Sequence, residues 1–183
     1  MPKRKAVKAE LVEDRVILWN KSDANKIFDS GWYGDFVEDR LELALLEAAL
    51  LLERKKIEIS KKRKNMNFKD FYKHCLKVDT RFNIRYAVYK DLRERGFPTR
   101  TGFKFGCDFR VYNRGVKPIK KGPKAAHEHT KWIVFAVPED YSCSFPELSR
   151  AVRLAHNIRA NMLWALVDND NDVTYYEVSY ISP

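Results

Sequence analysis

The stretch from Thr130 to Ile181, TKWIVFAVPEDYSCSFPELSRAVRLAHNIRANMLWALVDNDNDVTYYEVSYI, decides the fold class of this chain. Residues 130–138 are almost continuously apolar, which is typical of a strand buried on both faces. The sequence SFPE at 144–147 has the spacing of a capping box with proline in the first turn, so a helix starts there. Apolar runs at 162–168 and 173–181 predict two more strands. This order predicts an α/β domain with a mixed central sheet flanked by helices.

The residues before this stretch predict one more strand and a basic loop. In GFKFGCDFRVY at 102–112, Phe109 and Val111 form an apolar face, and Tyr112 lies on the opposite, polar face. The segment 113–129, NRGVKPIKKGPKAAHEH, is rich in lysine, proline and glycine, so we expect a loop there.

The first half of the chain predicts an α+β domain. A short strand is expected from Val12, and DRLELALLEAALLLER at 39–54 has the Leu- and Ala-rich pattern of an amphipathic helix. Residues 54–64, RKKIEISKKRK, predict an exposed strand and a basic turn. The lysines of this turn suit either RNA contact or a solvated edge that resists aggregation.

Two helices are expected near the middle of the chain. One begins after an Asn67 cap, and the other runs over residues 83–95, where Gly96 stops it. We place a domain boundary between these helices, so the expected domains are residues 1–82 and 83–183.

The chain has 183 residues, a net charge of +10 and 45% hydrophobic residues. These values suit one ordinary domain or two small ones with packed cores. The charge favours an acidic partner, either nucleic acid or an anionic membrane, with a well-solvated surface as the alternative. We expect no signal peptide and no membrane span, because apolar runs such as 43–52 are too short. Three separated cysteines suit a reduced, cytoplasmic protein.

No metal site is expected. HEH at 127–129 has no third ligand at suitable spacing. The alternating aspartates of DNDND at 168–172 are typical of the start of a calcium loop, but the required glycine and glutamate are missing. Asp108 and Glu128 with Lys131 are candidates for a metal-dependent nuclease, but their spacing supports two-metal chemistry poorly.

Tyr112, His129 and Arg153 could together cleave RNA without a metal. In such a reaction the 2′-hydroxyl attacks the adjacent phosphate, which requires a base, an acid for the leaving 5′ oxygen and a cation. Histidine titrates near neutral pH, whereas tyrosine serves as a base only beside cations that stabilise its phenolate. Each residue alone also fits an ordinary surface or loop role, so the hypothesis depends on their convergence in the fold.

A helix over residues 149–164 would have one apolar and one polar face. Its apolar face includes Ala155, whereas Arg153, His156 and Ala160 lie roughly opposite. We therefore expect Arg153 and Ala160, two turns apart, to share an exposed face that could hold an anionic ligand.

Four segments of the second half carry a family pattern: GFKFGCDFRVYNRG (102–115), EHTKWIVFAVPED (128–140), SRAVRLAHNIRA (149–160) and LWALVDNDNDVTYYEVSYISP (163–183). In this order they resemble the C-terminal domain of the archaeal tRNA-splicing endonucleases, or tRNA-intron lyases. The first half is similar to the family's N-terminal domain through WYGDF at 32–36 and the 39–54 helix.

The resemblance implies a restriction-endonuclease-like nuclease fold. It also implies an RNA endonuclease that cuts precursor tRNA at bulge-helix-bulge intron boundaries without a metal or another cofactor. The products would carry 2′,3′-cyclic phosphate and 5′-hydroxyl ends.

The resemblance further implies roles for single residues. Tyr112 matches the family's general base, His129 its general acid, and Arg153 an arginine that stacks on a bulged base. Further RNA contacts are expected from Lys117, Lys120, Lys121, Lys124 and Tyr175. The acidic turn with Asp168, Asp170 and Asp172 is similar to the loop that holds neighbouring subunits of the family together, and the strand 173–181 would pair across a dimer interface.

Two features depart from the family pattern. The loop from Val116 to Glu128 is long, as in crenarchaeal enzymes that assemble catalytic and structural subunits into a two-plus-two heterotetramer. Ala160 occupies the position of the family's catalytic lysine, so we expect an inactivated form that binds its substrate but cuts poorly. The alternatives are a non-catalytic structural or RNA-binding subunit, an active form whose cation comes from elsewhere, and a metal-dependent DNA nuclease.

Overall fold

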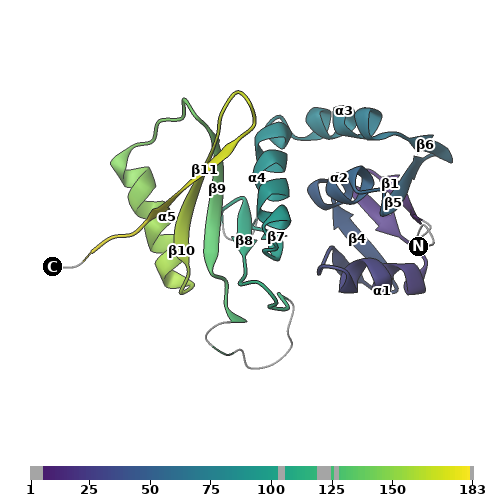
Figure 1. Cartoon of the computed structure of the whole chain (residues 1–183), viewed down its shortest axis with the longest axis horizontal. Coiled ribbons are helices and arrows are strands. Elements are labelled where there is room, and N and C mark those ends of the chain that lie inside the picture. The colour runs from purple at the N-terminus through teal and green to yellow at the C-terminus, as the bar shows by residue number, and fades with distance from the viewer. Residues whose placement is uncertain (1–5, 103–105, 119–124, 126–127, 182–183) are drawn as a thin grey trace. The chain divides into compact units, whose positions relative to one another are not determined.

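The computed structural model describes residues 6–102, 106–118, 125 and 128–181. They belong to two compact units, unit 1 up to Phe82 and unit 2 from Asn83, each with its own sheet (Figure 1). No helix among the described residues is long and apolar enough to cross a membrane.

Unit 1 is an α+β domain, as predicted. Its elements are β1 (Val7–Val12), β2 (Arg15–Leu18), α1 (Lys21–Asp29), β3 (Asp35–Val37), β4 (Arg40–Ala44), α2 (Leu45–Glu53), β5 (Ile57–Lys61), β6 (Lys64–Met66) and α3 (Phe68–Val78). The six strands form one sheet in the order β3-β4-β2-β1-β5-β6. The strand expected from Val12 is instead a hairpin of β1 and β2, because Glu13, with a φ of +53°, turns the chain back so that β2 pairs antiparallel with β1.

The prediction of one helix over residues 39–54 is wrong for its first part. Residues Arg40–Ala44 form β4, in which Leu41 and Leu43 are fully buried and face residues of β2. This period-2 alternation favours a strand that packs one face on the core. The helix begins only at Leu45 and is buried on most of its surface rather than amphipathic.

A buried glutamate holds the turn from β4 into α2. The Glu47 carboxylate accepts hydrogen bonds from the backbone N–H of Ala44 (2.9 Å) and of Gly34 (3.1 Å). Gly34 has a φ of +73°, and a Cβ atom there would lie 2.8 Å from the Glu42 carbonyl oxygen. Glycine is therefore required at this point of the WYGDF segment.

The predictions for the end of unit 1 are confirmed except for the exposure of the strand. β5 and β6 form the expected strand and basic turn, with Lys62 and Arg63 between them in the left-handed region. β5 is not an exposed strand, because it lies between β1 and β6 and its two isoleucines are buried. Asn67 caps α3, because its side-chain oxygen accepts a hydrogen bond from the backbone N–H of Asp70 (2.9 Å). Such a cap satisfies an N–H group that has no partner within the helix.

Unit 2 consists of α4 (Phe82–Glu94), β7 (Thr99–Thr101), β8 (Phe109–Val111), β9 (Trp132–Pro138), α5 (Phe145–Asn157), β10 (Asn161–Val167) and β11 (Val173–Val178). Its five strands lie in the order β11-β10-β9-β8-β7. β9 and β10 are parallel, and the other neighbours are antiparallel. The predicted mixed sheet is therefore confirmed.

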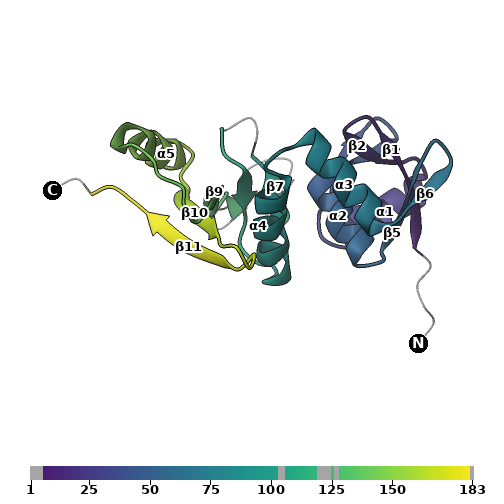
Figure 2. The same cartoon turned by 90° about the horizontal axis from the view of Figure 1, so that it is seen from above.

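Two helices cover opposite faces of this sheet (Figures 1 and 2). The buried residues Ala151 and Ala155 of α5 form one core cluster with Ile133 and Met162 of the sheet. On the other face, Tyr89 of α4 contacts Phe109 of β8, with 5.8 Å between the ring centroids. α5 begins at the predicted Ser144 cap, whose hydroxyl accepts a hydrogen bond from the Glu147 N–H. α4 ends as predicted before Gly96, which has a φ of +84°.

Asp108 connects three elements of unit 2 from a buried position. One of its carboxylate oxygens lies 3.1 Å from Nε of Arg85 in α4, and the other accepts the backbone N–H of Ala136 in β9 (2.9 Å). Its own N–H donates to the Val134 carbonyl. β8 begins only at Phe109, so it has no backbone carbonyl opposite the Ala136 N–H of β9. The Asp108 carboxylate accepts this N–H instead.

We predict that Asp108→Ala lowers the free energy of unfolding by about 3–5 kcal/mol, because it leaves a buried arginine charge and a strand N–H uncompensated. Asp108→Asn should cost less, since it keeps an acceptor for Ala136. Denaturant titration followed by tryptophan fluorescence measures both. Asp39→Ala, which breaks an exposed pair with Lys21, serves as the control and should change little. A loss below about 1 kcal/mol for Asp108→Ala would show that the ion pair does not hold unit 2 together.

Candidate active site

The ends of four strands meet at one edge of the unit 2 sheet. β9 and β10 are parallel and begin there, whereas the antiparallel β8 and β11 end there. Backbone hydrogen bonds connect the strand ends: the Lys131 N–H donates to the Val111 carbonyl (2.8 Å), and the Asn161 N–H donates to the Lys131 carbonyl (2.9 Å). We call this end of the sheet the catalytic edge, because the residues expected to be catalytic lie there.

The catalytic edge brings together the positions of Tyr112, His129 and Ala160. Tyr112 directly follows Val111, His129 lies two residues before Lys131, and Ala160 directly precedes Asn161. The expectation that Tyr112 lies on a polar, open face is wrong, since the residue is only 3% exposed. Its N–H donates to the Pro98 carbonyl (2.9 Å), which holds the backbone at the end of β8. His129 is half-buried.

The expected helical face shared by Arg153 and Ala160 does not exist, because α5 ends at Asn157. Arg159 follows with a φ of +56°, and its N–H donates to the His156 carbonyl (2.9 Å). The Ala160 N–H donates to the Ala155 carbonyl (2.9 Å). These two bonds form a Schellman motif, which reverses the chain at the helix end.

The same motif explains where the Ala160 side chain lies. In a Schellman motif the residue after the left-handed position often makes an apolar contact with the last turn of the helix. Ala160 is accordingly 8% exposed and belongs to the core cluster with Ala155 and Met162. Ala160 therefore lies directly before β10 at the catalytic edge, whereas Arg153 lies one turn before the end of α5, on the exposed side of that helix.

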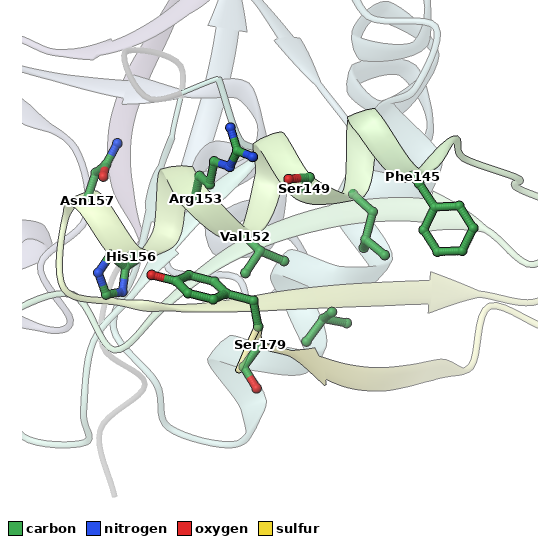
Figure 3. A pocket seen from close by; sticks show the side chains of 10 residues that line it. Phe145, Ser149, Val152, Arg153, His156, Asn157 and Ser179 are labelled. Atoms are coloured by element: carbon green, nitrogen blue, oxygen red, sulfur yellow. The ribbon is translucent and has the colours of Figure 1, made fainter. Parts of the chain in front are cut away.

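Arg153 lies beside a groove of about 590 Å³ between α5 and the residues that follow β11. Figure 3 shows Val152 turned toward the strand and Arg153 turned away from it. His156 also lines this groove and meets the Tyr180 ring, with 5.3 Å between the centroids. The arginine is thus open to a ligand that approaches the outer side of α5.

A polar and aromatic cluster at the catalytic edge was not predicted from the sequence. The Glu177 carboxylate accepts hydrogen bonds from Trp132 Nε1 (2.7 Å) and Asn161 Nδ2 (2.8 Å). The Lys131 ammonium lies 3.9 Å from the centroid of the Trp132 ring, which in turn meets the edge of Phe97. No short motif in the sequence signals this cluster, because it depends on the register of β9 and β10, which sets Trp132 opposite Asn161.

Tyr175 lies on the α4 side of the sheet, away from Arg153. Its hydroxyl donates to the Asp91 carboxylate (2.7 Å), and the same carboxylate oxygen lies 2.7 Å from Arg95 Nε. Burial and, after it, the hydrogen bond to Asp91 raise the pKa of Tyr175, so its hydroxyl remains a donor. The structure does not bring Tyr175 and Arg153 of one chain to a common surface.

The acidic turn lies at the other end of the sheet. Asp168 stands where β10 ends, and its Oδ1 accepts the N–H groups of Asp170 and Asp172 (2.9 Å each). β10 has seven residues, so the turn lies roughly 20 Å from the catalytic edge. The aspartates of the turn therefore cannot neutralise cations at the catalytic edge of their own chain.

Part of the basic loop falls outside the described residues, including Lys120, Lys121 and Lys124, whereas Lys117 is described and exposed. The carboxylates considered for a metal site have other partners. Asp108 contacts Arg85, and Glu128 accepts the Ala125 N–H (2.7 Å). Within the described ranges, no three His, Cys, Asp or Glu side chains are grouped as metal ligands.

The model of the tRNA intron endonuclease, catalytic C-terminal domain, matches residues 82–175, and that of the tRNA intron endonuclease, N-terminal domain, matches residues 7–72. This chain belongs to the tRNA intron endonuclease family. The family resemblance of the four segments is thus confirmed, as is the order of an N-terminal and a catalytic C-terminal domain.

Relatives of the chain match most of its length. A tRNA-splicing endonuclease of Thermococcus onnurineus is 36% identical over 97% of this chain and 98% of its own length. That of Thermococcus kodakarensis is 39% identical over 92% of this chain and 94% of its own. That of Nanoarchaeum equitans is 40% identical over 80% of this chain and 93% of its own.

We predict that Tyr175→Phe lowers the free energy of unfolding by about 1 kcal/mol, because it removes a half-buried hydrogen bond to Asp91. The loss is small because the Asp91 carboxylate still has its ion pair with Arg95. Thermal or chemical unfolding measures the change. The neighbouring Tyr176→Phe is the matched control, since Tyr176 is exposed on the other face of β11. Equal stability of the two variants would show that the Asp91 contact does not fasten β11 to α4.

Proposed function

We propose that this chain is a catalytic-type subunit of a tRNA-splicing endonuclease that cuts precursor tRNA at bulge-helix-bulge intron boundaries. The observation that carries the proposal is that the positions of Tyr112 and His129, on either side of the basic loop, both lie at the catalytic edge. The net charge of +10 supports a polyanionic substrate. Membership of the tRNA intron endonuclease family supports the choice of RNA.

The proposed reaction needs no metal. The 2′-hydroxyl gives its proton to the Tyr112 phenolate as the bond between the 2′-oxygen and phosphorus forms. The bond between phosphorus and the 5′-oxygen breaks, and protonated His129 gives that oxygen its proton. The products are a 2′,3′-cyclic phosphate, a 5′-hydroxyl, a neutral tyrosine and a neutral histidine.

The proposed RNA surface extends from the catalytic edge over α5 and the basic loop. Arg153 is exposed and open to a base, on which its guanidinium can stack. Lys117, Lys120, Lys121 and Lys124 would neutralise phosphates along the backbone. Tyr175 remains a candidate contact only for RNA held by another subunit, because it faces α4 rather than Arg153.

Assembly of the active enzyme is proposed to use the acidic turn. Its hydrogen bonds preform the turn, while Asp170 and Asp172 stay exposed for a basic surface of a neighbouring subunit. β11 is an edge strand with Tyr176 exposed, which supports pairing with a second chain. We propose that the partner is a structural subunit in a two-plus-two heterotetramer.

The uncharged Ala160 at the catalytic edge supports slow cutting by this chain. An alanine cannot stabilise the negative charge that develops on the phosphate, and loss of one such group typically costs about 10²–10³ in rate. The same alanine also favours a second candidate function, that of a non-catalytic RNA-binding or structural subunit.

We predict that Ala160→Lys raises the rate of cutting by roughly a hundredfold or more. The aliphatic stem of a lysine at position 160 can pack against the core while its ammonium reaches the surface at the catalytic edge. A labelled bulge-helix-bulge RNA incubated in EDTA, with the chain alone and with a candidate partner subunit, gives the rate and the product ends. Ala160→Met is the matched control, because it adds a similar stem without charge, and it should cut no faster than the original chain.

The other outcomes decide between the alternatives. RNA that is bound but uncut by both the original chain and Ala160→Lys, in every mixture, would contradict the catalytic assignment of Tyr112 and His129. Such a result would favour the non-catalytic subunit. Cutting that disappears in EDTA and returns with Mg²⁺ would contradict the metal-independent mechanism.

A further inference from the structure

We propose that Lys131 supplies the positive charge that stabilises the reacting phosphate at the catalytic edge. This inference rests on the proposed function. As the 2′-oxygen attacks phosphorus and the 5′-oxygen leaves, negative charge grows on the non-bridging phosphate oxygens. Tyr112 and His129 move protons in this step, so a separate cation is needed beside them.

Lys131 lies at the centre of the catalytic edge. Its N–H donates to the carbonyl of the residue before Tyr112, and its carbonyl accepts the N–H of the residue after Ala160. It is also two residues from His129. The backbone of Lys131 is thus bonded on one side to the last residue of β8, which precedes Tyr112, and on the other to the first residue of β10, which follows Ala160. From this position its flexible four-carbon stem can aim the ammonium at a phosphate held between them.

The Lys131 ammonium has only aromatic contacts among those found in the described part of the chain. It lies over the Trp132 ring at 3.9 Å and is 5.8 Å from the Phe97 centroid. The nearby Glu177 carboxylate already accepts hydrogen bonds from Trp132 and Asn161, one on each oxygen. An ammonium that lies on aromatic faces is available to an incoming anion, whereas an ion pair would have to break first.

Other described cations near the strand ends are less suited to this role. Arg95 is paired with Asp91, and Arg114 Nε donates to the Arg95 carbonyl while its guanidinium stacks on Phe97 at 4.7 Å. Arg159 is exposed, so water screens its charge, whereas Lys131 is half-buried. Arg159 also lies beside Ala160 but is exposed, so a variant without the Arg159 charge is a suitable control for a variant without the Lys131 charge.

A set of variants tests the inference. The original chain, Lys131→Met, Ala160→Lys and the double variant are compared for single-turnover cutting in EDTA at saturating bulge-helix-bulge RNA, with the RNA dissociation constant and the melting temperature measured in parallel. We expect Lys131→Met to cut at least tenfold more slowly, with the RNA dissociation constant changed less than threefold. Lys131→Arg should restore part of the rate, because it restores the charge.

The double variant shows whether Lys131 acts as the missing cation. A lysine at position 160 provides a second ammonium beside the same phosphate, so Lys131→Met should cost less than threefold in the Ala160→Lys background. A tenfold or greater loss in both backgrounds would overturn the inference. Arg159→Gln and Lys69→Met are controls that each remove one positive charge, the first beside the catalytic edge and the second in unit 1, and each should change the rate less than threefold.

Failure of the inference can be told apart from failure of the proposed function. If the original chain cuts but Lys131→Met cuts equally fast, Lys131 is not the cation and the proposed function stands. If neither the original chain nor Ala160→Lys cuts, the proposed function fails first. A larger loss for Arg159→Gln than for Lys131→Met would also overturn the inference.

Discussion

The parallel pairing of β9 with β10 is the constraint on which the candidate site of unit 2 depends. Seven residue pairs join the two strands, and α5 makes the crossover between them. Parallel strands begin at the same edge, so His129 and Ala160 come to one place even though a strand and a helix separate them. β8 is antiparallel to β9 and therefore ends where β9 begins, so Tyr112, which follows β8, lies at the same edge. Asp108 holds β8 in this arrangement through its contacts with Arg85 and Ala136.

Much of this fold could be predicted from the sequence, because its signals are local. The apolar run of β9, the Ser144 cap and the alternation in β8 each specify one element by burial or by capping. The prediction was wrong where two patterns overlap. Residues 39–54 contain both a period-2 alternation and a helix-forming run, and the pairing of β4 with β2 decides between them.

The candidate site was less predictable than the fold, because its geometry depends on contacts between distant residues. Tyr112 and His129 could be singled out, but the burial of Tyr112 follows from its place at the strand end. Ala160 was expected on an exposed helical face. The helix ends before it, and the left-handed conformation of Arg159 directs the Ala160 side chain into the core. The bonds of Glu177 to Trp132 and Asn161 join three strands, so no short motif encodes them.

The central claim is that RNA is cut at the catalytic edge by its own 2′-hydroxyl. The most direct measurement compares two bulge-helix-bulge RNAs in EDTA with Ala160→Lys, one unmodified and one with a single 2′-deoxynucleotide before the scissile phosphate. The account predicts that the unmodified RNA is cut to a 2′,3′-cyclic phosphate and that the deoxy RNA is bound but stays intact at that position. Cutting of the deoxy RNA at the same bond and a similar rate would contradict it, since water would then be the nucleophile.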